Sequence, residues 1–155
     1  MKRKALVFTA AALFAAVAVC YAAGDAFMGT WKLNEAKSKI GTGMPKNSLV
    51  VYAAADDSVK ITVDGTNADG TPLHSEWTGK FDGKDYALTG DPTADMRSYK
   101  MVNDHTLSLT SKKGGKVSGT TRVVVAADGK SRTVTSTGTN AKGMKTSATY
   151  VYDKQ

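Results

Sequence analysis

Two arginines stand on alternating segments where a positive charge would meet an anionic group. Arg97, Tyr99 and Met101 alternate along one segment, and Arg132 and Val134 alternate along another. Residues two apart in a strand point to the same side, so each arginine would share a face with apolar neighbours. An arginine enclosed there needs an anion or an acidic side chain, and its planar fork suits a carboxylate or a phosphate. The spacing therefore leaves two interpretations: the arginines point outward to solvent, or they point into the interior, where they would bind an anionic group or pair with an acidic side chain.

Aromatic side chains supply the candidate apolar contacts for such a molecule. Trp77 and Phe81 fall on one face of an alternating segment, and Tyr150 and Tyr152 alternate near the C-terminus. The first pair either packs in the core or, if the interior binds a small hydrophobic or amphiphilic molecule, contacts the apolar part of that molecule. The tyrosines and arginines are candidates for its polar head. The candidate ligand-binding residues are Trp77, Phe81, Arg97, Tyr99, Arg132, Tyr150 and Tyr152.

No residue pattern predicts catalysis or metal binding. The chain has two histidines, and His74 and Glu76 project from the polar face of their expected strand, which favours surface roles. No Ser-His-Asp arrangement stands out, and the glycines form no phosphate-binding GxxxxGK loop. The basic residues form no stripe with interleaved aromatics, which argues against nucleic acid as a partner. We therefore expect no catalytic residue, metal or cofactor, and an enzyme is the least favoured class.

The first 23 residues have the three parts of a secretory signal peptide. Residues 2–4 are basic, residues 5–19 form an apolar run, and residues 20–23 end in small side chains. The apolar run is shorter than the roughly 20 residues that span a bilayer. We expect cleavage after Ala22 or Ala23, giving a periplasmic or secreted protein without a membrane span.

Removing residues 1–23 would leave a single domain over 24–155. Loss of the three basic residues at 2–4 lowers the formal charge from +7 to +4. It also removes Cys20, the one cysteine, so the remaining chain can form no disulfide. A lipoprotein signal ending at Cys20 is the alternative, although Val19 is bulky for the last small position. We expect a monomer.

Segments rich in Val, Thr, Tyr and Ser, separated by Asp-Gly and other glycine-containing pairs, predict a succession of strands. One short helix is expected over 35–39, with Asn34 as its N-cap. The strands are expected near 27–33, 48–55, 58–64, 72–81, 85–89, 95–103, 105–113, 116–127, 131–139 and 145–152. Short connections predict antiparallel pairing, and a long meander closes to remove its edges. The predicted fold is all-β, an up-and-down antiparallel meander barrel of about 8–10 strands, with a two-sheet sandwich as the alternative.

The motif Gly29-Thr-Trp31 on the first expected strand resembles lipocalins and fatty-acid-binding proteins, and the stretch through Asn34 resembles exported bacterial lipocalin-like proteins. In those barrels the tryptophan plugs the closed end and packs against a basic residue from a late strand. The resemblance therefore implies that Gly29 and Trp31 form a barrel plug. The ending Tyr150-Val-Tyr152 resembles the last strand of fatty-acid-binding proteins, but Tyr150 stands where those proteins carry an arginine for the fatty-acid carboxylate.

Two function classes follow from these features. The first is an exported, non-enzymatic binding protein that holds a small hydrophobic or amphiphilic ligand in a barrel cavity. The segment from Thr133 to Thr139 has few large apolar groups, so a cavity walled there by Ser, Thr and Gly would suit an amphiphile. The alternative is an envelope or extracellular interaction protein that binds a protein or polymer through its outer surface.

Overall fold

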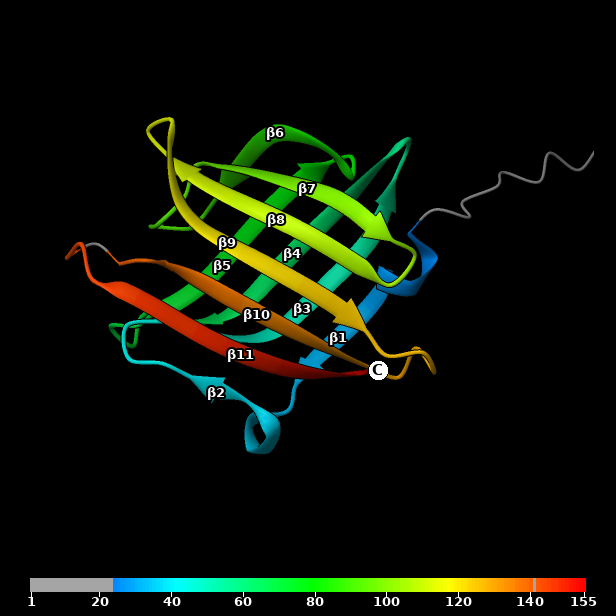
Figure 1. Cartoon of the computed structure of the whole chain (residues 1–155), viewed down its shortest axis with the longest axis horizontal. Coiled ribbons are helices and arrows are strands. Elements are labelled where there is room, and N and C mark those ends of the chain that lie inside the picture. The colour runs from blue at the N-terminus through cyan, green and yellow to red at the C-terminus, as the bar shows by residue number, and fades with distance from the viewer. Residues whose placement is uncertain (1–23, 141) are drawn as a thin grey trace, which may run out of the picture.

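Ten antiparallel strands close into a barrel in the computed structural model, which describes residues 24–140 and 142–155 (Figure 1). Each strand pairs with the next along the chain, and β1 pairs with β11 to close the ring. The ten strands are β1 (Gly29–Leu33), β3 (Lys46–Ala55), β4 (Ser58–Thr66), β5 (Pro72–Gly79), β6 (Asp82–Thr89), β7 (Met96–Asn103), β8 (Thr106–Lys113), β9 (Lys116–Val125), β10 (Ser131–Thr139) and β11 (Lys145–Lys154). The closed ring confirms the predicted meander barrel and excludes the sandwich. The signal-peptide prediction for residues 1–23, with Cys20, lies outside the described residues.

A further short strand, β2 (Lys39–Ile40), pairs with the same edge of β11 as β1 does, but nearer the start of β11. β1 pairs with the end of β11 at Tyr152–Lys154, whereas β2 pairs with Ala148 and Thr149 nearer its start. The chain leaves the barrel wall between β1 and β2 and then returns to it (Figure 1). Together the two short strands protect the backbone edge of β11 that β1 alone leaves open.

The predicted helix over 35–39 is a single 3-10 turn, η2 (Glu35–Lys37). Asn34 caps it as expected, because its side-chain oxygen accepts a hydrogen bond from the Lys37 amide at 3.2 Å. The turn stops because Ser38 is tied to the barrel. Its hydroxyl donates to the Asn34 carbonyl at 2.7 Å and accepts from the Val151 amide at 2.9 Å. Pairing with β11 therefore outweighs continuation of the helix.

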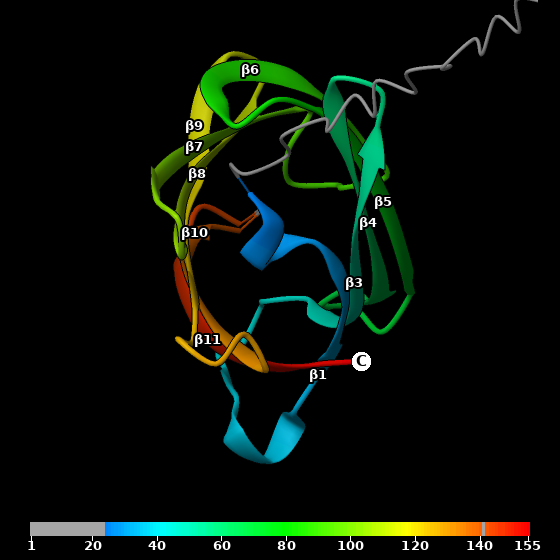
Figure 2. The same ribbon diagram turned by 90° about the vertical axis from the view of Figure 1, so that its right-hand side faces the viewer.

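The first strand begins later than the expected boundary at residue 27. Asp25–Phe27 form a 3-10 turn, η1, and Gly29 has a φ of +106°, in the left-handed region that favours glycine. Gly29 therefore allows the chain to pass from η1 into β1. Seen along the barrel, η1 lies across one end of the ring of strands (Figure 2).

The predicted turn at Asp82-Gly83 lies inside strand β6 instead of ahead of it. The Asp82 carboxylate accepts a hydrogen bond from the Lys84 amide at 3.0 Å, and Gly83 has a φ of +80°. The pairing of β6 with β7 shifts register between Asp82 and Asp85. The turn-forming residues thus produce a bulge, which bends the strand without ending it.

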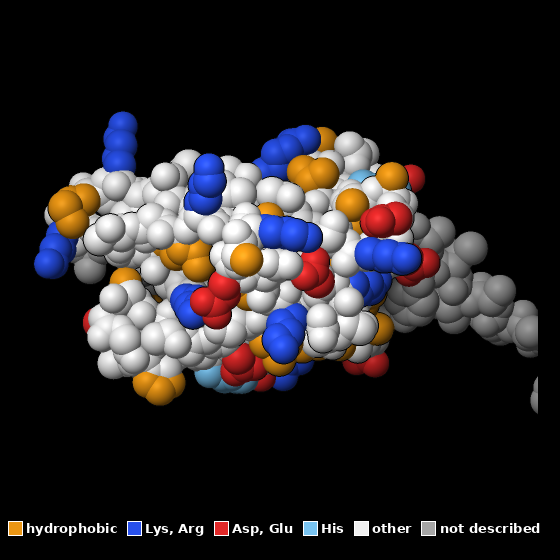
Figure 3. Space-filling model, turned by 90° about the horizontal axis from the view of Figure 1, so that it is seen from below, with side chains coloured by type: hydrophobic (Ala, Val, Ile, Leu, Met, Phe, Trp, Pro, Cys, Tyr) orange, Lys and Arg blue, Asp and Glu red, His pale blue; other side chains and the backbone are white. Residues whose placement is uncertain are grey.

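Alternation along the strands separates an apolar interior from a solvated exterior. On β5, Leu73, Ser75 and Trp77 are buried, while His74 and Glu76 point outward. Lysines and arginines are interspersed with acidic side chains on the face shown in Figure 3, as expected for a solvated surface. In the described part of the chain, no helix has the length and apolar character needed to cross a membrane.

The end of the barrel that η1 covers is filled by aromatic side chains. Phe27 and Trp31 are fully buried, and Trp31 Nε1 donates a hydrogen bond to the Phe27 carbonyl at 2.8 Å. The Trp77 ring centre lies 4.4 Å from that of Tyr99 and 6.4 Å from that of Phe81. Phe81 follows β5 instead of belonging to it, and its ring packs edge-on against Phe27 at 6.1 Å. This end of the barrel is therefore a packed core.

Candidate ligand-binding cavity

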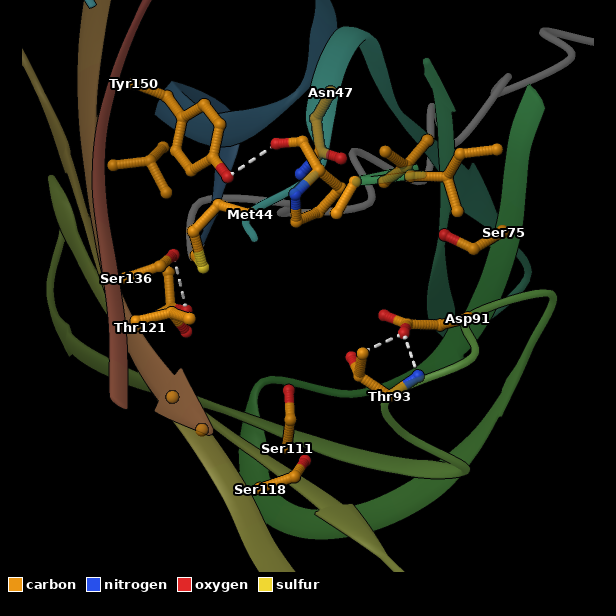
Figure 4. Close-up of a pocket in the computed structure, with 18 of the residues that line it drawn as sticks. Met44, Asn47, Ser75, Asp91, Thr93, Ser111, Ser118, Thr121, Ser136 and Tyr150 are labelled. Carbon is orange, nitrogen blue, oxygen red and sulfur yellow. Dashed lines mark hydrogen bonds between the residues drawn. The ribbon is translucent and has the colours of Figure 1, made fainter. Parts of the chain in front are cut away.

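A cavity of about 770 Å³ occupies the barrel beyond the aromatic core. Tyr52, Tyr99 and Arg132 line its inner end, and residues of the loops that precede β3, β5, β7 and β11 line its outer end. The labelled side chains in Figure 4 surround an open space and do not fill it. The interior of the barrel is thus a packed core at one end and an open cavity at the other.

Small residues on β8, β9 and β10 keep this space open. Gly119 and Gly138 lie opposite each other on β9 and β10, and both line the cavity. Two residues further in, the hydroxyls of Thr121 and Ser136 share a hydrogen bond of 2.8 Å. Ser111 on β8 adds a third hydroxyl to this wall. The opposite wall, on β3, β4 and β5, is more apolar and contributes Val50, Val63 and Leu73.

Arg132 lies at the inner end of the cavity among aromatic rings. Its side chain belongs to a residue only 3% exposed. The guanidinium carbon is 4.7 Å from the centre of the Trp31 ring and 4.8 Å from those of Tyr52 and Tyr152. Nε and Nη1 have no hydrogen-bond partner among residues 24–140 and 142–155. The rings favour a cation there, but they leave these two donors unsatisfied.

Arg97 also lines the cavity, but its charge is already paired. Its Nη2 donates to Asp91 Oδ2 at 3.1 Å, and its Nε donates to the Ser111 hydroxyl at 3.0 Å. Asp91 Oδ1 accepts from the amide and the hydroxyl of Thr93, at 2.8 and 2.7 Å. The ion pair therefore ties the loop before β7 to the barrel wall.

The hydroxyls of Tyr150 and Tyr152 bind the backbone at the start of β3. Tyr150 donates to the Pro45 carbonyl at 2.8 Å, and Tyr152 donates to the Asn47 carbonyl at 3.0 Å. Burial raises the pKa of Tyr150 to about 12 and also raises the pKa of Tyr152, so both phenols stay neutral at ordinary pH. Both rings line the cavity. Their hydroxyl hydrogens are already used in the hydrogen bonds to the backbone at the start of β3.

The structure brings five of the seven candidate ligand-binding residues to the cavity. These five are Arg97, Tyr99, Arg132, Tyr150 and Tyr152. Trp77 and Phe81 belong to the aromatic core instead, and Trp77 Nε1 donates to the Arg97 carbonyl at 2.9 Å. Their shared face does point inward, but at a depth where large rings fill the interior.

The sequence did not single out Asp91 or Asn47, which also line the cavity. Asp91 stands in an Asp-x-Thr turn that looks like an ordinary loop, and only folding brings it to Arg97. Asn47 lies next to a register shift between β3 and β4, and its side-chain oxygen is buried without a hydrogen-bond partner in the part of the chain that the structure describes. Among the described residues, no group of His, Cys, Asp and Glu side chains is arranged to hold a metal. The geometry is that of a binding pocket with a few placed polar groups.

No protein-family model and no curated protein sequence matches this chain. Among solved structures, a redesigned β-barrel, mFAP1, bound to DFHBI, covers 81% of this chain and 94% of its own, at 18% sequence identity and a TM-score of 0.40. A likeness this distant carries no argument about function, so the function is inferred from the cavity itself.

Proposed function

We propose that this protein is an exported, non-enzymatic binding protein that holds a small amphiphilic molecule inside its barrel. The observation that carries the proposal is the cavity of about 770 Å³, a size within the range of roughly 300–1,000 Å³ for small-molecule sites. The secretory pattern of residues 1–23 supports export. The resemblance of Gly29-Thr-Trp31 to lipocalins supports a binding role.

The two walls of the cavity favour an amphiphile over a purely apolar molecule. Val50, Val63 and Leu73 offer apolar contact on one side. Thr121 and Ser136 on the other side share one hydrogen bond, which leaves hydroxyl donor and acceptor capacity for a ligand. A wholly apolar molecule would cover these hydroxyls without replacing their bonds to water, which costs free energy.

A fluorescent fatty-acid probe, 11-(dansylamino)undecanoate, tests the proposal by titration into the purified protein. Ser136→Trp would place a large ring in the cavity and should abolish or weaken probe binding at least tenfold. Its matched control is Thr135→Trp, because Thr135 is the exposed neighbour on the outer face of the same strand. Circular dichroism verifies that both variants fold.

Loss of binding in the inner variant alone would support a ligand inside the barrel. Equal binding by both variants would place the probe on the surface and overturn the proposal. Failure of the wild-type protein to bind this probe and any other amphiphile would favour an interaction protein that uses its outer surface.

Export is tested separately, by N-terminal sequencing of the protein recovered from its own host. We expect the chain to start at Ala23 or Gly24, because the small residues before these positions suit signal cleavage. A lipid-modified Cys20 at the N-terminus would overturn this part of the proposal and show a lipoprotein.

A further inference from the structure

The Arg132 guanidinium is a buried charge for which the described residues supply no counter-charge. None of the ion pairs among these residues includes Arg132. The other charge beside the Trp31 ring is also positive, since the Lys154 ammonium lies 5.2 Å from the ring centre. A buried charge is costly unless it is paired and hydrogen-bonded. The inner end of the cavity therefore carries a buried positive charge that no acidic side chain of the described residues balances.

The tyrosines beside Arg132 do not supply a negative charge to balance the guanidinium. Burial raises the pKa of Tyr99 and of Tyr152, so neither phenol ionises at ordinary pH to balance the charge. The Tyr152 hydroxyl hydrogen is used on the Asn47 carbonyl. The aromatic faces stabilise the cation, but the described residues still provide no acceptor for Nε and Nη1.

Arg97, in the same cavity, has both an ion-pair partner and a hydrogen-bond acceptor. Asp91 neutralises it, and Ser111 accepts from its Nε. An anionic ligand at Arg97 would have to compete with Asp91, which the loop before β7 holds in place through Thr93. An anion at Arg132 would displace no acidic side chain of the described chain. The two arginines are therefore not equivalent candidates for the ligand head.

We propose that Arg132 anchors the anionic group of the bound molecule, so that an anionic amphiphile enters the barrel head first. This inference rests on the proposed function and specifies its ligand class. A carboxylate or a phosphate suits the guanidinium fork equally well in geometry. The middle of the molecule then passes Val63 and Leu73, and its outer part reaches the hydroxyl-bearing wall and the entrance loops.

The test compares ligands that share one chain length and differ in the head: dodecanoate, monododecyl phosphate and dodecanol. Their affinities are measured by displacement of 11-(dansylamino)undecanoate and, independently, by calorimetry. The wild-type protein should bind at least one of the two anions tenfold or more tightly than dodecanol. Arg132→Met, which keeps an unbranched side chain, should remove that preference while changing dodecanol affinity less than threefold.

Arg122→Met is the matched control, because Arg122 is exposed on the outer face of β9. This variant should retain the preference for anions. A second measurement needs no folded variant: the Arg132 Nε–H signal in the NMR spectrum of the wild-type protein should shift with the preferred anion and not with dodecanol.

Tight binding of dodecanol and both anions with equal affinity would overturn the inference and leave the proposed function standing. Loss of the preference in Arg97→Met but not in Arg132→Met would also overturn it, since Arg97 would then be the anchor. Binding of none of the three ligands would overturn the proposed function, and this inference with it.

Discussion

The two ends of the barrel interior are built from the same strands but from side chains of very different size. At the end covered by η1, Phe27, Trp31 and Trp77 are almost fully buried and belong to the packed core. At the other end, β9 and β10 turn Gly119 and Gly138 toward each other, and the interior remains open. Protein interiors are close-packed wherever side chains can reach one another. Alternation thus decides which residues face inward, and their size decides whether they form a core or a cavity.

The largest effect expected from breaking this contrast is at the packed end. Trp31→Ala should lower the free energy of unfolding by about 3–5 kcal/mol, because it removes a fully buried ring and leaves a cavity. It also removes the donor to the Phe27 carbonyl. Chemical denaturation measures the change. Thr121→Ala at the open end is the control and should cost less than about 1 kcal/mol; similar losses for both variants would contradict the contrast.

An intermediate effect is expected at the Arg97–Asp91 pair, which holds the loop before β7 against the barrel wall. Both side chains are less than one-fifth exposed, at 17% and 18%. Asp91→Ala should lower the free energy of unfolding by about 1–3 kcal/mol, because it leaves a mostly buried charge without its hydrogen-bonded partner. Hydrogen exchange should accelerate in the loop before β7, since Thr93 loses its acceptors. Unchanged exchange there would show that the loop does not depend on this pair.

A larger side chain in the cavity should weaken ligand binding with little change in the free energy of unfolding. Ser75 is buried, lines the cavity and lies one inward position from Trp77 on β5. Ser75→Leu should change the free energy of unfolding by less than about 1 kcal/mol, because the cavity has room for the larger group. The same variant should weaken binding of the dansyl fatty acid several-fold. A large loss of stability would mean that this part of the barrel is packed as tightly as the core.

The smallest effect is expected on the outer surface, at His74. A hydrogen bond with Asp64 raises the pKa of His74 above its ordinary value of 6.5. A raised folded-state pKa means that this pair stabilises the fold fully below the unfolded pKa and loses its contribution as pH rises through the folded pKa. Asp64→Asn should lower the pKa of His74 in an NMR titration and leave ligand binding unchanged. An unaltered pKa in this variant would contradict the assigned cause.

The inward face of β5 could be predicted because its two faces differ in composition. Leu73 and Trp77 share one side, whereas His74 and Glu76 share the other, and the structure has them inside and outside respectively. The turns at Asp-Gly pairs were also predictable from their tolerance of positive φ, as at Gly129 with a φ of +69°. Where turn residues lie at the edge of a bulge, as at Asp82-Gly83, the local signal is the same and only strand pairing distinguishes the outcomes.

The sequence alone does not determine whether the Arg132 side chain points into the barrel or out of it. On β10 one face carries Arg132, Val134, Ser136 and Gly138, and the other carries serine and threonines. Neither face is clearly apolar, so composition does not choose between them. Register does, because Arg132 lies opposite Val125 on β9 and Tyr152 on β11, both of which are buried. Residues directly opposite in neighbouring strands share a face, and so Arg132 is inside.

The sequence by itself determined the strand-and-turn order and the meander, because these depend on local propensity and period-two alternation. Only the tertiary structure decided that Trp77 and Phe81 lie in the core, that Asp91 neutralises Arg97, and that none of the described residues supplies a counter-charge to Arg132. The physical reason is that depth along the barrel and charge pairing depend on which distant residues meet across the interior. Alternation within one strand contains no information about those encounters.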